Sequence, residues 1–127
     1  MAHRFSIELS SDYEDRGRYD VKMSCELADE AGARIGFVTA GGGDGGGVSL
    51  AGGVKLETGP CSGVRVFVYV IPRQLPEQRR VSSKYDFQMV LCVRCDGKTV
   101  KKETVDVNKW GGASVERAYD SSGQVKG

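Results

Sequence analysis

Apolar and polar residues alternate along the first third of the chain in a way that predicts β-strands. Over residues 19–27 every second position is apolar, and the positions between them are polar or charged. Residues 5–9 and 33–39 repeat the same pattern. The turn-forming residues 29–32 separate two of these segments, so the sequence predicts an antiparallel hairpin there.

One segment departs from this alternation. Residues 64–71 read Val-Arg-Val-Phe-Val-Tyr-Val-Ile, in which only Arg65 is polar. Because side chains alternate between the two faces of a strand, the valines share one face and Phe67, Tyr69 and Ile71 share the other. A strand that is apolar on both faces is normally covered on both. We therefore expect the aromatic face to pack against this chain or against a partner.

A later hairpin is predicted around Gly97. The valines of its returning strand, Val100 and Val105, lie an odd number of residues apart and cannot share a face of an unbroken strand. A three-residue loop with Gly97 as the bulge residue would pair Phe87 with Val105, whereas a two-residue turn would place Asp106 opposite Phe87. The sequence favours the three-residue loop.

About seven to eight short strands with no strong helical period predict an all-β fold. We expect an antiparallel β-sandwich, with a partly open β-barrel as the alternative. Residues 1–119 are predicted to form one domain, and the Ser- and Gly-rich residues 120–127 a flexible tail. The longest apolar run, residues 66–71, is far shorter than the ~20 residues of a membrane-spanning helix.

No signal peptide is recognised, so a cytoplasmic location is the default expectation, with export by a leaderless route left open. The formal net charge of +1 argues against a dedicated nucleic-acid-binding protein. A long connection over residues 72–83 nevertheless concentrates positive charge. With Lys84 it forms a candidate basic loop that would bind an anionic ligand, through Arg73, Arg79, Arg80 and Lys84.

The sequence offers little support for a metal or catalytic site. Cys92 and Cys95 have the spacing of half a zinc knuckle, but no second close pair of ligands accompanies them. No metal site and no cofactor are therefore predicted, and the thiols are expected to be structural. The single histidine, His3, lies near the N-terminus, where we expect fraying and poor placement for general-base catalysis.

These observations favour a non-catalytic module that binds a protein partner or a second copy of itself. The predicted contact is the face with Phe67, Tyr69 and Ile71, or the basic loop. The alternative is binding of a glycan or small ligand by loops at one end of the sandwich, through Trp110, Tyr13 and Asp44. A small enzyme that uses paired carboxylates is less favoured, because no acidic pair stands in an apolar context.

Overall fold

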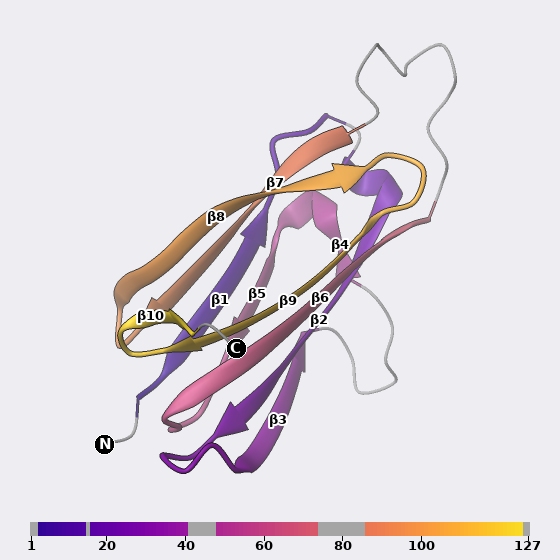
Figure 1. Ribbon diagram of the computed structural model, residues 1–127. Helices are drawn as coiled ribbons and strands as arrows, with labels where there is room; N and C mark the ends of the chain where they lie inside the picture. The colour runs from indigo at the N-terminus through magenta and orange to yellow at the C-terminus, as the bar shows by residue number, and fades with distance from the viewer. Residues whose placement is uncertain (1–2, 15, 41–47, 74–85, 126–127) are drawn as a thin grey trace.

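The protein is an antiparallel β-sandwich, seen in a computed structural model that describes residues 3–14, 16–40, 48–73 and 86–125 (Figure 1). The small sheet has the strand order β5 (Val54–Glu57), β1 (Phe5–Ser10), β7 (Asp86–Cys95) and β8 (Lys98–Asn108). The large sheet has the order β10 (Gly123–Val125), β9 (Ala113–Asp120), β6 (Gly63–Pro72), β2 (Tyr19–Ala28) and β3 (Arg34–Ala40), and β4 (Val48–Ser49) also pairs with β2. Two single-turn 3-10 helices, η1 (Arg16–Arg18) and η2 (Leu50–Gly52), lie beside each other.

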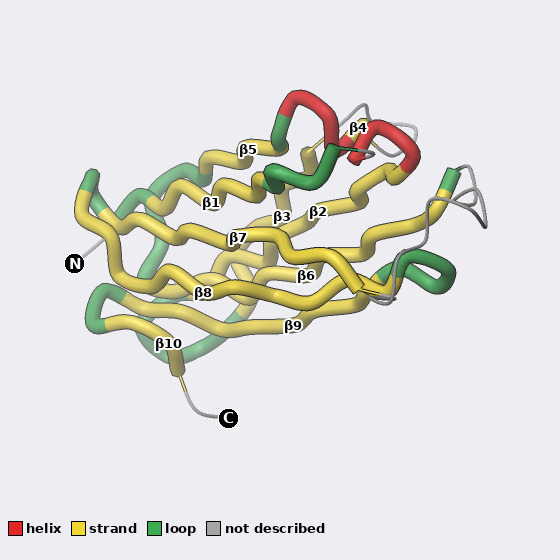
Figure 2. Tube along the Cα trace, turned by 90° about the horizontal axis from the view of Figure 1, so that it is seen from above, coloured by secondary structure: helices red, strands yellow, loops and turns green. Residues whose placement is uncertain are grey.

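The predicted sandwich is thus confirmed. The two sheets remain separate over the described strands, so the partly open barrel is wrong. On one flank of the sandwich β8 runs beside β9 and β10, as Figure 2 shows, and on the other flank β3 contacts β5. Among the described residues no helix is long and apolar enough to cross a membrane.

The core lies between the sheets and is built by the alternation seen in the sequence. In β2 every odd-numbered residue from Tyr19 to Leu27 is buried, and in β1 the same holds for Phe5, Ile7 and Leu9. The inward residues of β6 are the valines Val64, Val66, Val68 and Val70. Burial of these side chains removes apolar area from water and supplies the main favourable term for folding.

Only one face of β6 is covered by the described part of the chain. Its valines are 3% exposed or less, whereas Tyr69 is 46% and Ile71 is 44% exposed on the opposite face. Phe67, two positions before Tyr69 on the same face, is half-buried. The small sheet packs on the valine face, so it does not cover the face with Phe67, Tyr69 and Ile71.

The register of the β7–β8 hairpin differs from the prediction. The turn has two residues, Asp96 with φ 52° and Gly97 with φ 85°, and Cys95 pairs with Lys98. A β-bulge at Val100 then shifts the register by one residue, so that Phe87 pairs with Val107. The three-residue loop is wrong, because the break in the strand lies within β8 and not at the turn.

The C-terminal segment adds one more strand. Gly123–Val125 lies within the segment predicted to be a flexible tail, and it pairs antiparallel with β9 at the edge of the large sheet. Asp120 fixes the turn before it by accepting hydrogen bonds from the backbone nitrogen and the hydroxyl of Ser122, at 2.8 and 2.6 Å. These bonds also hold the pKa of the Asp120 carboxyl below its usual range.

Candidate functional site

The outer face of the large sheet carries an apolar stripe. Phe67, Tyr69 and Ile71, called the outer patch below, follow one another along β6 on the face away from the core. Phe37 on β3 is 47% exposed and Ile35, at the β-bulge of the same strand, is 55% exposed. Among the described residues, Ile35, Phe37, Tyr69 and Ile71 are the large hydrophobic side chains that are exposed.

The outer face of the small sheet is different in character. Apart from Val90 and Cys92 on β7, its outward positions are polar or charged: Ser6, Glu8 and Ser10 on β1, Gln88 and Arg94 on β7, and Lys102, Thr104 and Asp106 on β8. Solvated sheets normally look like this, with apolar residues inward and polar residues outward. The apolar outer patch is therefore a property of one face and not of exposed strands in general.

Charged residues of both signs border the outer patch on its two sides. Across β9, Glu116 pairs with Phe67 in the strand register and its carboxylate lies 2.8 Å from the Arg65 guanidinium. Across β2, Lys22 stands next to Tyr69. Positive and negative groups thus flank the same apolar stripe from opposite directions.

The basic loop lies largely outside the described residues. Arg79, Arg80 and Lys84 lie outside them, and Arg73 is the one member that is described. The Arg73 guanidinium donates a hydrogen bond to the carbonyl oxygen of Gly17 and lies 3.7 Å from the Asp20 carboxylate. Its charge is therefore engaged with its own chain, at the end of β6.

Of the three residues predicted for ligand binding, Tyr13 and Trp110 lie in the described part of the chain. Tyr13 stacks on Phe87 with ring centroids 4.5 Å apart, so its partly buried ring packs against the core. Trp110 is half-buried in the β8–β9 turn, where its backbone nitrogen donates to the Asn108 side chain at 2.9 Å. Asp44 lies outside the described residues.

The two cysteines with knuckle spacing point to opposite faces. Cys92 is half-buried on the outer face of β7, between Glu8 on β1 and Lys102 on β8. Cys95 is 5% exposed and faces the interior. Two residues three positions apart in an extended strand cannot present both sulfurs to one ion, so the pair makes no zinc knuckle.

Different burial should make the cysteines chemically unequal. Burial, with smaller contributions from Cys61 and Glu26, raises the pKa of Cys25 to about 12. The thiolate is the nucleophile in alkylation, so at about pH 8 we expect iodoacetamide to modify Cys92 first and to leave Cys25 unmodified until the protein is denatured. Peptide mass mapping of native and denatured samples measures this order, and equal labelling of both thiols in the native protein would contradict it.

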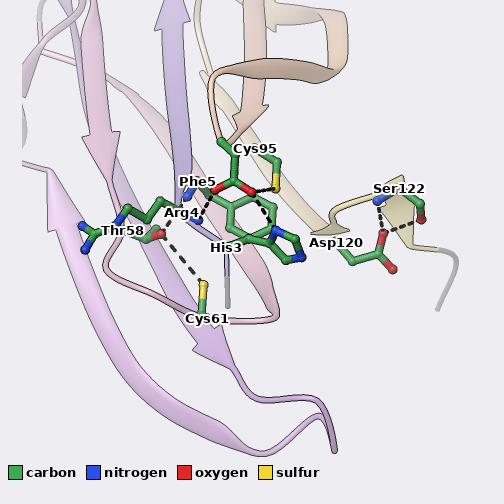
Figure 3. A network of polar contacts seen from close by, with 9 residues as sticks. His3, Arg4, Phe5, Thr58, Cys61, Cys95, Asp120 and Ser122 are labelled. Atoms are coloured by element: carbon green, nitrogen blue, oxygen red, sulfur yellow. Dashed lines mark hydrogen bonds and ion pairs between the residues drawn. The ribbon is translucent and has the colours of Figure 1, made fainter. Parts of the chain in front are cut away.

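A cluster of polar side chains forms where the N-terminal segment meets the β7–β8 turn (Figure 3). The Nδ1 atom of His3 lies 2.7 Å from Oδ2 of Asp96, and the Cys95 thiol donates to the same oxygen at 3.8 Å. Together His3, Cys95 and Asp96 form a group whose ligand atoms all lie within 4.8 Å of one another. Among the described residues, this is the group of three side chains that could together bind a metal ion. Sequence spacing could not have shown it, because Cys95 and Asp96 are 92 residues or more from His3.

The expectation that His3 frays is wrong. His3 forms an antiparallel bridge with Cys61, with backbone hydrogen bonds of 2.7 and 2.9 Å in the two directions. Asp96 also holds Arg4 in place. The backbone nitrogen of Asp96 donates to the carbonyl oxygen of Arg4, and its carboxylate accepts from the Arg4 backbone nitrogen. The segment is therefore an ordered extension of the small sheet.

Local contacts shift the pKa values of Asp96 and Cys95 in opposite directions. The backbone hydrogen bond from Arg4, followed by the contact with His3, holds the pKa of the Asp96 carboxyl below its usual range. Burial, followed by the negative charge of Asp96, raises the pKa of Cys95. The carboxylate stands between the thiol and the imidazole, whereas nucleophilic cysteines are activated by an imidazole in direct contact. The arrangement is thus unlike that of a cysteine hydrolase.

Comparison with known proteins adds information on fold. No protein-family model and no curated protein match the sequence. The NMR structure of the calcium-bound form of a protein from Parabacteroides distasonis aligns over 93% of this chain and 92% of its own, with a TM-score of 0.51 and 14% identity. The crystal structure of a domain of unknown function, DUF4425, from Bacteroides vulgatus aligns over 93% and 90%, with a TM-score of 0.50 and 15% identity. At such identities the likeness is one of fold, and it supports the sandwich.

Proposed function

We propose that this protein is a non-catalytic binding module that self-associates, with the outer patch of one copy packed on the outer patch of a second. The observation that carries the proposal is the exposure of Tyr69 and Ile71 on a strand whose other face is fully buried. Contiguous apolar residues on one face, bordered by polar residues, are typical of protein interaction surfaces. Burial of these side chains against an identical face would give β6 its second cover.

The distribution of charge supports a second copy as the occupant. A two-fold interface needs a surface that is complementary to itself, with both signs of charge on the same face. The strands β2 and β9 flank β6 on opposite sides. A two-fold axis along β6 would therefore bring Lys22 on β2 of one copy over β9 of the second, the strand that carries Glu116.

The proposal predicts that a charge at the centre of the patch abolishes the dimer. Tyr69→Glu would place two carboxylates opposite each other at the interface, and we expect the dissociation constant to rise at least about 100-fold. The fold should tolerate the change, because Tyr69 is 46% exposed and Lys22 stands beside it. Sedimentation equilibrium over a range of protein concentrations, with far-UV circular dichroism as the folding check, measures both effects.

A matched control comes from the other sheet. Thr104→Glu introduces the same charge at an exposed strand position on the polar outer face of β8, and we expect it to dimerise as the wild type does. A wild-type protein that stays monomeric up to its solubility limit would overturn the proposal. So would a Tyr69→Glu variant that associates as strongly as the Thr104→Glu control.

The calcium named for the Parabacteroides distasonis protein is not the ion that suits the cluster described above. Calcium takes six to eight oxygen ligands. Within the described ranges, the group of three metal-ligating side chains supplies one carboxylate, one imidazole and one thiol. Its chemistry fits a softer ion.

A further inference from the structure

The end of the sandwich around His3 assembles three different metal-ligating groups from two separate parts of the chain. His3 belongs to the N-terminal segment, and Cys95 and Asp96 belong to the end of β7 and the turn that follows. Their ligand atoms are a ring nitrogen, a sulfur and a carboxylate oxygen, all within 4.8 Å of one another. We propose that these three residues bind a divalent transition-metal ion, and that zinc is the ion that fits best.

The backbone holds these groups in place before any ion arrives. His3 is fixed by its bridge to Cys61, and Cys95 is fixed by its pairing with Phe5 across β1 and β7. Asp96 occupies a tight turn that is hydrogen-bonded through its backbone nitrogen to Arg4. Ligands on paired strands and a tight turn lose little freedom when a metal binds, which favours affinity.

Two of the three spacings between ligand atoms are close to those around a tetrahedral ion, and the third is within 4.8 Å. Zinc binds nitrogen and carboxylate oxygen at about 2.0–2.2 Å and sulfur at about 2.3 Å, so the ligand atoms of one site lie roughly 3.3–3.8 Å apart. The Cys95 sulfur is 3.8 Å from Oδ2 of Asp96, at the upper end of this range. The His3 nitrogen, at 2.7 Å from the same oxygen, needs to move outward by less than about 1 Å.

The choice of zinc follows from ligand type and charge. Imidazole and thiolate are ligands of zinc and not of calcium or magnesium. When the ion binds, the Cys95 thiol releases its proton to solvent, and His3 coordinates through the Nδ1 lone pair with its proton on Nε2. The thiolate and the Asp96 carboxylate then balance the two charges of the ion. A water molecule would complete the four ligands.

The site also has an entry path. The side chain of Asp96 is 54% exposed and that of His3 is 22% exposed, so the cluster is partly open to solvent. Asp96 lines a surface cavity of 620 Å³ together with Arg4, Thr58 and Gly97. Solvent can therefore reach the carboxylate and the imidazole, whereas the Cys95 side chain is buried.

Cobalt(II) binding to the full chain under reducing conditions tests this proposal, because a cobalt–thiolate bond gives a charge-transfer absorption that other ligands do not. We expect wild-type protein to bind one Co²⁺ with this absorption and Zn²⁺ to displace it. Cys95→Ser should abolish the absorption. His3→Ala and Asp96→Asn should weaken binding by at least about tenfold.

Cys92→Ser is the matched control, since Cys92 lies on the same strand but on the outer face. It should bind Co²⁺ as the wild type does. His3→Ala and Asp96→Asn change partly exposed side chains, and Asn tolerates the positive φ of residue 96. These two variants decide the question even if Cys95→Ser does not fold. Absence of cobalt–thiolate absorption in the wild type, its loss in Cys92→Ser, or unchanged affinity in both His3→Ala and Asp96→Asn would overturn the proposal.

Discussion

Replacement of Gly112 by alanine is expected to lower the free energy of unfolding by about 4 kcal/mol, a large part of the stability of a domain of this size. Gly112 precedes β9 and has a φ of +80°, a conformation that costs other residues roughly 1–2 kcal/mol. A Cβ atom at this position would also overlap the carbonyl oxygen of Val70 and come within 3.3 Å of Pro72. Neither backbone can move away, because Val70 pairs with Ala113, the next residue of the chain.

Gly32→Ala separates the two causes of this loss. Gly32 has nearly the same φ, +84°, but a Cβ added there would meet no atom within 4 Å. We expect Gly32→Ala to cost about 1 kcal/mol, which is the conformational penalty alone. Urea unfolding of both variants, analysed by linear extrapolation, measures the difference. Equal losses in the two variants would show that the close approach of β9 to β6 is not tight.

The local alternation of apolar and polar residues was enough to predict the strands that have one solvent-exposed and one buried face. Residues 19–27 alternate without an error, and β2 buries each apolar position of that run. The turn before β3 was equally predictable, because Asp29 accepts hydrogen bonds from the backbone nitrogens of Ala31 and Ala33. In both cases the information lies within a few neighbouring residues, which is the range that periodicity and turn chemistry cover.

The hairpin register could not be predicted in the same way. The two-residue turn has the positive φ angles that Asp96-Gly97 favours, yet its register alone would have put Asp106 opposite Phe87. The bulge at Val100 corrects this by inserting one residue, and no local feature of a Lys- and Val-rich segment marks that position. What fixes the bulge is the packing of the valines that follow it, and packing depends on the other sheet.

The candidate sites also differ in whether local sequence or long-range contacts determine them. The outer patch could be predicted, because Phe67, Tyr69 and Ile71 are spaced two residues apart in one strand. The cluster of His3 with Cys95 and Asp96 could not, because it depends on the bridge between the N-terminal segment and Cys61. Long-range strand order, which places β1 between β5 and β7, is what brings these residues together.

Phe87→Ala is the core substitution for which we expect the second large effect, a loss of about 4 kcal/mol in the free energy of unfolding. Phe87 is 6% exposed and its ring contacts two others, Tyr13 at 4.5 Å and Tyr19 at 4.8 Å between centroids. Truncation would leave a cavity that neighbouring strands cannot fill, because Tyr19 is held by a 2.6 Å hydrogen bond from its hydroxyl to the carbonyl of Lys109. It would also remove the ring on which Tyr13 stacks, and with it the contact that fixes the segment after β1.

Phe37→Ala provides the comparison, since it removes the same side chain from the outer face of the large sheet. Phe37 is 47% exposed and contacts the Arg34 guanidinium 5.2 Å from its ring centroid. We expect its loss to cost less than about 1 kcal/mol in the monomer, because little buried area and no cavity are involved. Chemical denaturation of the two variants at low protein concentration measures the contrast. A large loss for Phe37→Ala would mean that this ring is already covered within one chain, and Phe37 would then not be part of the apolar surface open to a second copy.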